Sequence, residues 1–282
     1  MRTGLVTDSN SDLPDDLIQR YQIEVIPNTL VMDGLPYLDG LEISRSDFYK
    51  RLPDLRQTPT TAAPSQAEFS ARYHKLFTAG CEHVIGIFTA EKLTAISNIA
   101  RLAAAEIPGQ VSVIESGSLS MGVGYQVLAA AQAIERGQPL AEVLRQVQSV
   151  RERIKLYAAL DTLEYMRRSG RVPQAVSALG GLLKIKPVIE LREGVVRPVD
   201  ALRTTGRATE KLISLLLELQ PFEHLTILHT NAEARARELL ERLETMPGLP
   251  LPEKPLIVNV TSVIGTHVGP NGLGIALVRS HW

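Results

Sequence analysis

The sequence has few of the residues that mark several common classes of protein. It contains a single cysteine, Cys81, which excludes an internal disulfide and a cysteine-cluster metal site and fits a reducing compartment. It has no run of about 18 apolar residues, and residues 1–12 turn polar before a secretion signal could form. These absences predict a cytoplasmic protein without stable insertion into a membrane.

An excess of charge of either sign is also missing. The chain has 30 basic and 31 acidic residues, so its formal net charge is -1 and it has no overall attraction to nucleic acid or to anionic membranes. The six histidines are scattered without the spacing of metal ligands, and no metal site is expected. Any partner must therefore be recognised by local groups.

Three motifs of nucleotide-binding proteins and hydrolases are absent. No glycine is followed at the Walker A spacing by Gly-Lys-Ser or Gly-Lys-Thr, and the glycines at 269, 272 and 274 do not match a dinucleotide fingerprint. Residues 116–122 do not fit the Gly-x-Ser-x-Gly motif of hydrolases. These absences weigh against nucleotide binding and serine hydrolysis, and no cofactor is expected.

What the sequence does have is length and a regular alternation of segments. Its 282 residues, 44% of them hydrophobic, exceed the usual length of one domain, so we expect two domains. Up to residue 153, apolar runs alternate with amphipathic stretches, which predicts βαβ units and a parallel sheet. The expected strands here are residues 3–7, 23–26, 29–32, 84–88 and 111–114, and the expected helices include 15–21, 94–105, 122–136 and 140–153. Ligands bind beyond the carboxyl ends of such strands, so the loops after residues 7, 88 and 114 are candidate binding loops.

The pattern changes after residue 153. The expected strands are now residues 155–160, 183–190, 195–203, 225–229, 256–260 and 274–278, and the expected helices are 162–168, 209–219 and 233–244. Arg192-Glu193-Gly194 is a signal for a hairpin turn. Hairpins mixed with helices predict a second α/β domain with a mixed sheet, so we divide the chain into domains 1–153 and 154–282.

Two polar segments stand out as candidate ligand sites. Residues 264–274 carry four glycines and a proline around His267, which predicts a shaped loop. Residues 58–65 hold threonines and two prolines before a helix that Ser65 and Glu68 can open as a capping box. This second segment is equally compatible with a capped surface loop and with an anion site at the helix start.

The side chains of these segments are hydrogen-bond donors. The hydroxyls of Thr60 and Thr61, those that follow the strand ending at residue 88, and His267 can together bind a buried carboxylate. Each such bond contributes roughly 1.5–3 kcal/mol. The set would hold a carboxylate without transforming it, which from residue types alone is one of several options.

Five segments of the chain resemble the successive signatures of the DegV family. They are residues 7–14 (TDSNSDLP), 39–44 (DGLEIS), 60–65 (TTAAPS), 163–171 (LEYMRRSGR) and 264–270 (IGTHVGP). The resemblance spans nearly the whole chain. It implies a two-domain α/β fold of the DegV/EDD type, in which a Rossmann-like parallel sheet is followed by a C-terminal α/β domain with a mixed six-stranded sheet, and a long-chain fatty acid lies between the two domains.

The resemblance also implies a function. Bacterial members serve as the FakB subunit of fatty acid kinase, and they present the carboxylate of a bound fatty acid to a separate FakA subunit that phosphorylates it to acyl phosphate. The expected partners are therefore a long-chain fatty acid and a FakA-like kinase subunit. On this basis the protein is a lipid-binding, substrate-presenting subunit and not an enzyme on its own.

By the same resemblance, Thr61 and His267 match the family's carboxylate-binding threonine and histidine. The family's third contact is a serine, but Ala90 and Glu91 stand in its place, which removes a hydroxyl and brings a negative charge. Either Thr89 or Thr94 replaces the lost donor, or the head-group site has changed. The neighbouring hydroxyls of Thr60 and Thr266 complete the expected set of ligand-binding residues.

Two further groups of residues have both a structural and a functional interpretation. Arg167, Arg168, Arg171, Lys184 and Lys186 form a local excess of positive charge, which is either a solvated helix end or a docking surface for the kinase with Arg167 and Arg171 at its centre. Leu160, Leu163, Leu179, Leu182, Leu183 and Ile185 are either ordinary core or the lining of an acyl pocket.

Two alternative functions remain open from the sequence. Dihydroxyacetone kinases resemble this fold, and His267 could hold a small carbonyl substrate covalently or by a hydrogen bond, as they do. The protein could also be a sensor or scaffold in which bound lipid stabilises one arrangement of the domains.

Overall fold

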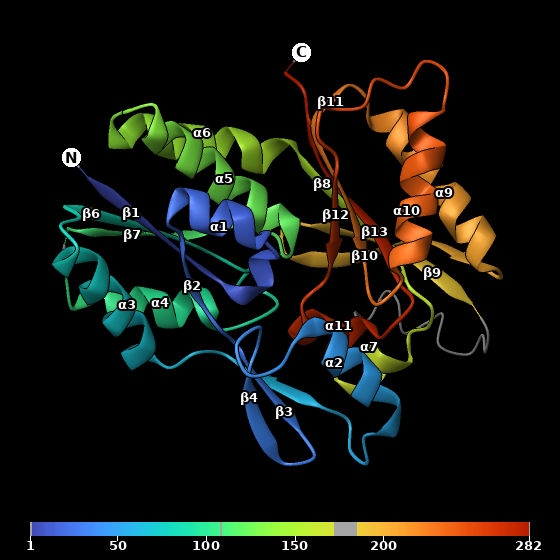
Figure 1. The fold of residues 1–282 in the computed structure, drawn as a ribbon, viewed down its shortest axis with the longest axis horizontal. Helices are drawn as coiled ribbons and strands as arrows, with labels where there is room; N and C mark the ends of the chain where they lie inside the picture. Colours follow the sequence, from blue (N-terminus) through green and yellow to red (C-terminus); the bar gives the residue numbers. More distant parts are fainter. Residues whose placement is uncertain (1, 108, 172–184, 282) are drawn as a thin grey trace.

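The computed structural model describes residues 2–107, 109–171 and 185–281. Its α/β architecture agrees with the prediction: a four-stranded parallel sheet and a six-stranded mixed sheet lie side by side (Figure 1). A third, three-stranded sheet lies below the junction of the two in the view of Figure 1. The functional interest of the fold is at this junction.

The first sheet is formed by the βαβ units predicted from the N-terminal half. Its strands are β1 (Thr3–Asp8), β2 (Glu24–Ile26), β6 (His83–Phe88) and β7 (Val111–Glu115), in the order β2-β1-β6-β7. All neighbouring pairs are parallel. Nearly every residue of β1 and β6 is buried, because helices cover both faces of a parallel sheet.

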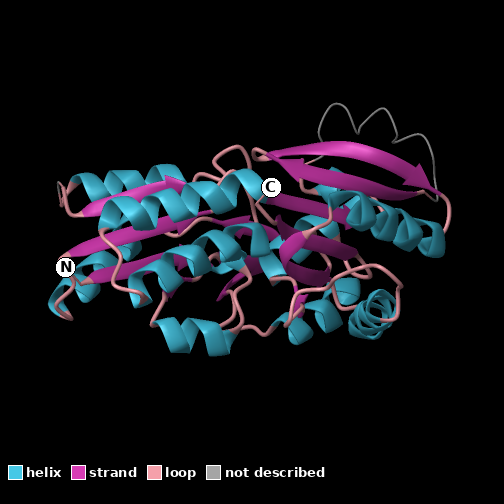
Figure 2. Ribbon diagram, turned by 90° about the horizontal axis from the view of Figure 1, so that it is seen from above, coloured by secondary structure: helices cyan, strands magenta, loops and turns pink. Residues whose placement is uncertain are grey.

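The helices of this half divide between the two faces of the first sheet. The helices are α1 (Asp15–Tyr21), α3 (Gln66–Thr78), α4 (Ile96–Ala105), α5 (Met121–Glu135) and α6 (Leu140–Arg153). Helices α1, α5 and α6 pack with Leu5, Ile85 and Ile87 on one face, and α3 and α4 pack with Val6 and Val84 on the other. Figure 2 shows helices on both sides of these strands.

The second sheet has six strands in the order β10-β9-β8-β13-β11-β12. They are β8 (Ile154–Ala159), β9 (Lys186–Arg192), β10 (Val195–Leu202), β11 (Phe222–His229), β12 (Leu256–Asn259) and β13 (Leu273–Arg279). The pair β11 and β12 is parallel and the other pairs are antiparallel, which makes the sheet mixed as expected. The predicted turn at residues 192–194 joins β9 to β10, and Glu193 and Gly194 both have positive φ there.

Two helices cover the outer face of the second sheet. Helices α9 (Thr205–Leu219) and α10 (Glu233–Glu244) pack on Tyr157, Ile227 and Ile275. Residues on the opposite face, among them Leu156 and Leu228, share a core cluster with α5 and the first sheet. Because this core joins the two halves, the division of the chain at residue 153 stays a prediction.

The third sheet corrects one prediction from the sequence. It consists of β3 (Thr29–Met32), β4 (Leu35–Leu38) and β5 (Thr60–Ala62), in the order β4-β3-β5. Residues 60–62 were expected in a loop, but they pair antiparallel with β3, so that Thr61 lies opposite Leu30. A strand of three residues with no alternation of apolar side chains gives no recognisable pattern in the sequence. Further short segments among the described residues are η1 (Ser9–Ser11), α2 (Arg45–Arg51), η2 (Leu52–Asp54) and α7 (Glu164–Arg168).

The glycine-rich segment around His267 is a second correction. Its first part is not a loop but the end of a helix, α11 (Ser262–Val268). Gly265 lies inside this helix. Glycine is needed at this position because a Cβ atom there would be 2.4 Å from the hydroxyl oxygen of Tyr49. The helix ends at Gly269, whose φ of 75° and ψ of 178° suit glycine almost exclusively. Close packing at Gly265 and the helix end at Gly269 therefore account for two of the four glycines.

Candidate lipid site between the two sheets

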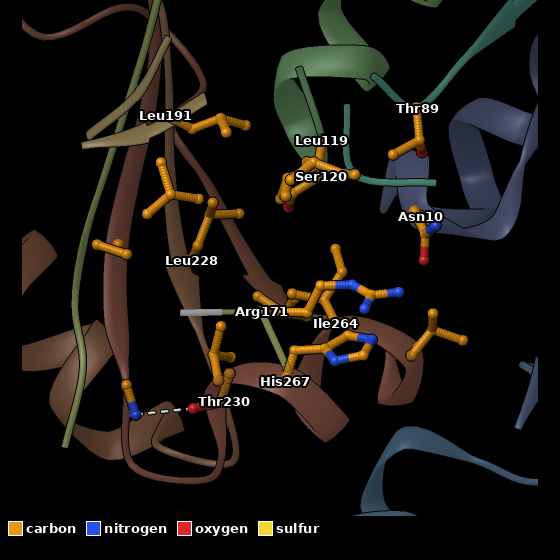
Figure 3. A pocket seen from close by; sticks show the side chains of 18 of the residues that line it. Asn10, Thr89, Leu119, Ser120, Arg171, Leu191, Leu228, Thr230, Ile264 and His267 are labelled. Carbon is orange, nitrogen blue, oxygen red and sulfur yellow. Dashed lines mark hydrogen bonds between the residues drawn. The ribbon is translucent and has the colours of Figure 1, made fainter. Parts of the chain in front are cut away.

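A cavity of about 330 Å³ lies between the two large sheets. Its volume is within the range of about 300–1,000 Å³ that small-molecule sites usually have. The loops after β1, β6 and β7 contribute Asn10, Thr89 and Ser120, and these are the loops that the strand pattern marked as binding loops. Figure 3 shows Asn10 and Thr89 across the cavity from Leu191 and Leu228.

Two of the predicted ligand-binding residues meet at one end of this cavity. The Thr61 Oγ1 atom of β5 lies 3.3 Å from the His267 Nε2 atom of α11, although the two residues are 206 positions apart in the chain. Both side chains are partly buried and both line the cavity. The structure thus brings together the threonine and the histidine from opposite ends of the sequence.

The imidazole of His267 is uncharged at neutral pH. Burial and, to a smaller extent, the positive charge of Arg171, which also lines the cavity, together lower its pKa from 6.5 to about 4. A neutral imidazole has one N–H donor and one acceptor nitrogen. The Nδ1 atom is buried without a hydrogen-bond partner among the described residues. In the tautomer that carries its proton on Nε2, His267 is a hydrogen-bond donor beside the Thr61 hydroxyl; in the other tautomer Nε2 accepts from that hydroxyl.

The hydroxyl of Thr89 is already in use. It donates to both carboxylate oxygens of Asp8, at 2.9 and 3.0 Å, and the Thr89 backbone N–H donates to the same carboxylate at 2.9 Å. Burial raises the pKa of Asp8, while these hydrogen bonds favour its charged form. Thr89 lines the cavity, but its proton points to Asp8 and not to a ligand.

The other predicted hydroxyls differ in position. Thr94 is half-buried in the cavity wall, and its hydroxyl has no hydrogen-bond partner within the described part of the chain. Thr60 is exposed on the other face of β5, and Thr266 is buried and donates to the backbone oxygen of Ser262 at 3.0 Å. Neither Thr60 nor Thr266 lines the cavity, so the structure does not support a contact of these two with a ligand there.

The two residues that depart from the family pattern, Ala90 and Glu91, both lie outside the lining of the cavity. Glu91 is exposed, pairs with Arg101 at 3.1 Å and does not line the cavity. Ala90 is fully buried, and its Cβ atom is 3.0 Å from the position that a Cβ on Gly194 would take. A small residue is needed at position 90 because the β9–β10 turn packs there, and the charge of Glu91 points outward.

That turn joins the two halves at the side of the cavity. The Gly194 backbone N–H donates to the Gly117 oxygen at 2.7 Å, and the Lys92 ammonium group donates to the Glu193 oxygen at 3.0 Å. The strands behind the turn provide Leu191 and Val196 to the cavity wall. The hairpin of the second sheet therefore covers the cavity and contacts the loops of the first sheet.

Most of the cavity wall is aliphatic. Its aliphatic residues from the second sheet are Leu156 and Ala158 of β8, Leu160 directly after β8, Ile189 and Leu191 of β9, Val196 of β10 and Leu228 of β11. Of the predicted aliphatic residues, Leu160 lines the cavity, while Leu163 packs beside it against Met166 and does not. Ile185 does not line the cavity, and Leu179, Leu182 and Leu183 lie outside the described residues.

Most of the described residues of the predicted basic patch form ion pairs with nearby carboxylates. Arg167 makes a two-pronged contact with Glu164 at 3.0 Å, and Arg168 pairs with the same carboxylate at 2.8 Å. Lys186 pairs with Asp161, and Lys184 lies outside the described residues. Arg171, predicted as a docking residue, lines the cavity near His267 (Figure 3).

The strand pattern marked the loops that hold Asn10 and Ser120, but it did not identify these two residues or Asn28 individually, and all three line the cavity. Their signal was weak, since each is one polar residue in a loop or strand end. Over the described residues, no cluster of histidine, cysteine and acidic side chains suits a metal ion, and no helix is both long and apolar enough to cross a membrane.

Comparison with known proteins agrees with this architecture. The family model described as uncharacterised protein, DegV family, matches residues 2–280. A DegV domain-containing protein of Streptomyces coelicolor is 30% identical over 278 residues, which cover 97% of each chain. A DegV family protein of Thermus thermophilus, described by its fatty acid binding, has a TM-score of 0.91 and 32% identity, with 99% of each chain covered.

Two further solved structures have the same fold. A Thermotoga maritima protein described as revealing a fatty acid binding function has a TM-score of 0.87 and 27% identity, with 99% of each chain covered. A stearic acid-binding protein of Eubacterium ventriosum has a TM-score of 0.87 over 99% of this chain and 98% of its own, and at 20% identity this likeness shows the fold alone. The family match over nearly the whole chain and the shared fold lead to one conclusion: the chain belongs to the DegV family.

Proposed function

We propose that this protein binds a long-chain fatty acid in the cavity between its two large sheets. The observation that carries the proposal is the pairing of Thr61 and His267 at one end of a cavity whose wall is otherwise mostly aliphatic. The fatty acid binding described for the Thermus and Thermotoga relatives supports the same ligand class.

The two parts of the cavity suit the two parts of such a ligand. Burial of methylene groups contributes about 0.8 kcal/mol each, so a chain of eighteen carbons gains on the order of 10 kcal/mol before the cost of immobilisation. A carboxylate needs donors when it leaves water, and the Thr61 hydroxyl and the His267 Nε2–H can both donate to it. The aliphatic wall then supplies affinity and the Thr61–His267 pair fixes the position of the head group.

We further propose that the protein presents this carboxylate to a separate FakA-like kinase subunit, which forms the acyl phosphate. Thr61 and His267 are partly exposed whereas Leu156 and Leu191 are buried, so a second protein can reach the head-group end. In this proposal the chain contributes binding residues and no catalytic residue. It would work in the cytoplasm, where a kinase subunit has ATP.

Native mass spectrometry of the protein purified from a bacterial host tests the binding proposal. One long-chain acid should accompany each protein chain, and it should be released on denaturation. A protein that arrives without ligand and takes up neither stearate nor oleate would contradict the proposal.

Docking of the kinase is tested separately by reversing the charge of the Arg167 side chain. This residue is exposed and outside the cavity, whereas Arg171 lines the cavity and its reversal would also disturb the ligand. Arg167→Glu should reduce acyl phosphate formation with the kinase and leave fatty acid affinity unchanged. Arg237→Glu is the matched control, because Arg237 is an exposed helical arginine paired with Glu233 in the same way. Equal activity of the two variants would remove Arg167 from the docking surface.

The same structure gives less support to a small carbonyl substrate. Dihydroxyacetone could reach His267, but it would leave the aliphatic wall formed by β8, β9 and β10 unfilled. Borohydride trapping of a dihydroxyacetone adduct on His267 would reverse this preference. A lipid-dependent sensor would use the same fatty acid site and would bind its partner without phosphorylation.

A further inference from the structure

Asp8, the last residue of β1, has a fully buried carboxylate that takes no part in the proposed contacts with the fatty acid. Four donor groups surround it: the backbone N–H of Asn10 at 3.0 Å, the side-chain amide of Asn28 at 3.3 Å, and the backbone N–H and the hydroxyl of Thr89, both at 2.9 Å. Because every neighbour can donate, an ionised carboxylate satisfies them all. A buried charge is costly unless it is hydrogen-bonded in this way, so its presence calls for a role in the structure around it.

The three residues that donate to Asp8 come from three different strand ends of the first sheet. Asn10 follows β1, Asn28 follows β2 and Thr89 follows β6, and all three line the cavity. Figure 3 shows Asn10 and Thr89 on the side of the cavity opposite Leu191 and Leu228. In a parallel sheet the ligand-binding loops leave the same edge, and one carboxylate at that edge can hold their N–H groups together. Asp8 therefore fixes the polar wall that the first sheet gives to the cavity.

Asn28 is also the joint between the first sheet and the third. It stands between β2 and β3, and among the described residues no strand of the first sheet pairs with a strand of the third. The Asn28 side-chain amide donates to the Ser9 hydroxyl at 3.0 Å, and the Asn28 backbone N–H donates to the same hydroxyl at 3.2 Å. Together with the bond to Asp8, these contacts tie the joint to the end of β1.

The joint in turn sets the position of Thr61. Thr29, the residue after Asn28, pairs with Ala62, and Leu30 pairs with Thr61. Strand β5 has no strand partner other than β3 among the described residues, so the place of β5 depends on the place of β3. The 3.3 Å distance between the Thr61 Oγ1 atom and the His267 Nε2 atom therefore depends on how the joint at Asn28 is held.

Apolar packing of the third sheet offers a competing explanation. Leu30 and Met32 of β3 are buried in a cluster with Phe48 and Tyr49 of α2, and this cluster could hold the sheet without help from Asp8. Hydrophobic contact is non-directional, however, whereas the hydrogen bonds at the joint have defined distances and directions. The two explanations predict different effects of Asp8 on the binding site.

We propose that Asp8 is a positioning residue for the head-group end of the cavity: its carboxylate holds the joint at Asn28 and thereby places the Thr61 hydroxyl where it meets the ligand. This inference rests on the proposed function, because it names a residue that prepares the same site. Asp8 does not line the cavity, so it acts through Thr61 and not by contact with the fatty acid. A binding group held in this way needs little reorganisation when the ligand arrives.

A double-mutant cycle tests the proposal, with stearate affinities measured by equilibrium dialysis of radiolabelled stearate. Asp8→Asn keeps the shape of the side chain, but in either orientation of its amide one backbone N–H, of Asn10 or of Thr89, faces an NH2 group. In the wild-type background this change should weaken stearate binding about 10-fold. In a Thr61→Val background it should change the affinity by less than about twofold, because the hydroxyl that Asp8 positions is already absent.

Two further variants complete the design. Glu115→Gln is the matched control: Glu115 ends β7 and accepts the backbone N–H groups of Glu91 and Gly117 at 3.1 and 3.0 Å, but neither of these residues lines the cavity. Its effect on stearate affinity should be the same in both backgrounds. Ser9→Ala removes the other acceptor at the joint and should show the same coupling to Thr61→Val, so it replaces Asp8→Asn if that variant does not fold.

A merely structural role of Asp8 gives a different result, namely additive losses. If Asp8→Asn weakens stearate binding by the same factor with and without the Thr61 hydroxyl, or leaves the wild-type affinity unchanged, the assignment is wrong. A wild-type protein that does not bind stearate contradicts the proposed function itself. Additive losses in a protein that does bind stearate contradict this inference alone, and the two failures are thereby separated.

Discussion

The site relies on neutral donors more than on charge. At neutral pH His267 carries no charge, since burial lowers its pKa to about 4, and Thr61 is a hydroxyl. Arg171 contributes a positive charge from the cavity wall, but it is itself exposed to solvent. A ligand carboxylate would therefore be held by directed hydrogen bonds, which fix its orientation better than a solvated ion pair would.

Removing the Thr61 hydroxyl should weaken the head-group contact. Thr61→Val keeps the shape of the side chain and should lower stearate affinity by about 10- to 100-fold, because a hydrogen bond to a charged group contributes about 1.5–3 kcal/mol. Thr60→Val is the matched control, since Thr60 is the exposed neighbour outside the cavity and its change should have an effect within about twofold. Equal losses in both variants would show that the strand, and not the hydroxyl, is responsible.

His267 should make the protein sensitive to acid. The pKa of His267 is about 4 in the folded protein, below its ordinary value of 6.5, so the unfolded chain binds a proton first as the pH falls. The contribution of His267 to stability is therefore present above pH 6.5 and is lost as the pH falls towards 4. The wild type should lose up to about 2 kcal/mol more than His267→Gln between pH 7 and pH 4.5 in urea unfolding without ligand. Parallel pH profiles of the two proteins would contradict this assignment.

At the scale of elements, regular periodicity was predictable and short irregular elements were not. Helix α6 was expected at residues 140–153 and is observed there, because Val143, Val147 and Val150 recur at helical spacing on its buried face. Strand β5 was missed because three residues with no apolar alternation form a strand only through pairing with β3, about thirty positions away in the sequence. Helix α11 was missed because its glycines indicated a loop, although Gly265 serves close packing against Tyr49.

The binding site likewise has a part that the sequence predicted and a part that it did not. Thr61 and His267 were identified from a resemblance between segments, and the structure shows that they meet. The engagement of the Thr89 hydroxyl by Asp8 depends on a contact between residues 81 positions apart. No local pattern could predict that a hydroxyl in a candidate binding loop is already paired with a buried carboxylate.

The end of α11 should be sensitive to a side chain at Gly269. A Cβ atom there would lie 2.2 Å from the ring of Tyr165, and the positive φ of 75° adds backbone strain. Gly269→Ala should destabilise the protein by about 3 kcal/mol or more in urea unfolding. Gly170→Ala is the control, because Gly170 has a similar φ of 67° with no atom of the described residues within 4 Å of the added carbon, and it should cost about 1 kcal/mol. Similar losses would mean that Tyr165 moves aside easily.

On the scale of the whole molecule, buried polar contacts join the halves next to the cavity. Asp12, from the loop after β1, pairs with Arg45 at 3.2 Å and accepts the Thr261 backbone N–H at 2.8 Å. Burial raises the pKa of Asp12 to about 6 in spite of Arg45. Asp39 accepts the hydroxyls of Thr261 and Ser262. These contacts hold the start of α11, and hence His267, against the first half of the chain.

Because both halves form the cavity, a ligand should stabilise both. Stearate at about one hundred times its dissociation constant should add about 2.7 kcal/mol and raise the melting temperature by roughly 5 °C or more. Hydrogen exchange should slow in the loops after β1 and β6 and in β8 and β9 together. Protection confined to one half would place the ligand elsewhere, and methyl stearate serves as the control without a free carboxylate.

The position of β13 has a consequence for synthesis of the protein. Among the described strands β13 comes last in the sequence, yet it lies in the second sheet between β8 and β11 and pairs antiparallel with both. During synthesis on the ribosome, the edges of β8 and β11 that pair with β13 therefore remain unpaired until residues 273–279 emerge. The first sheet can already form by then. Unpaired edges invite wrong pairing, so the nascent chain should depend most on chaperones during this final interval. Under the proposed function, the chain could bind its fatty acid only after this interval, because β13 lies between the strands that line the cavity.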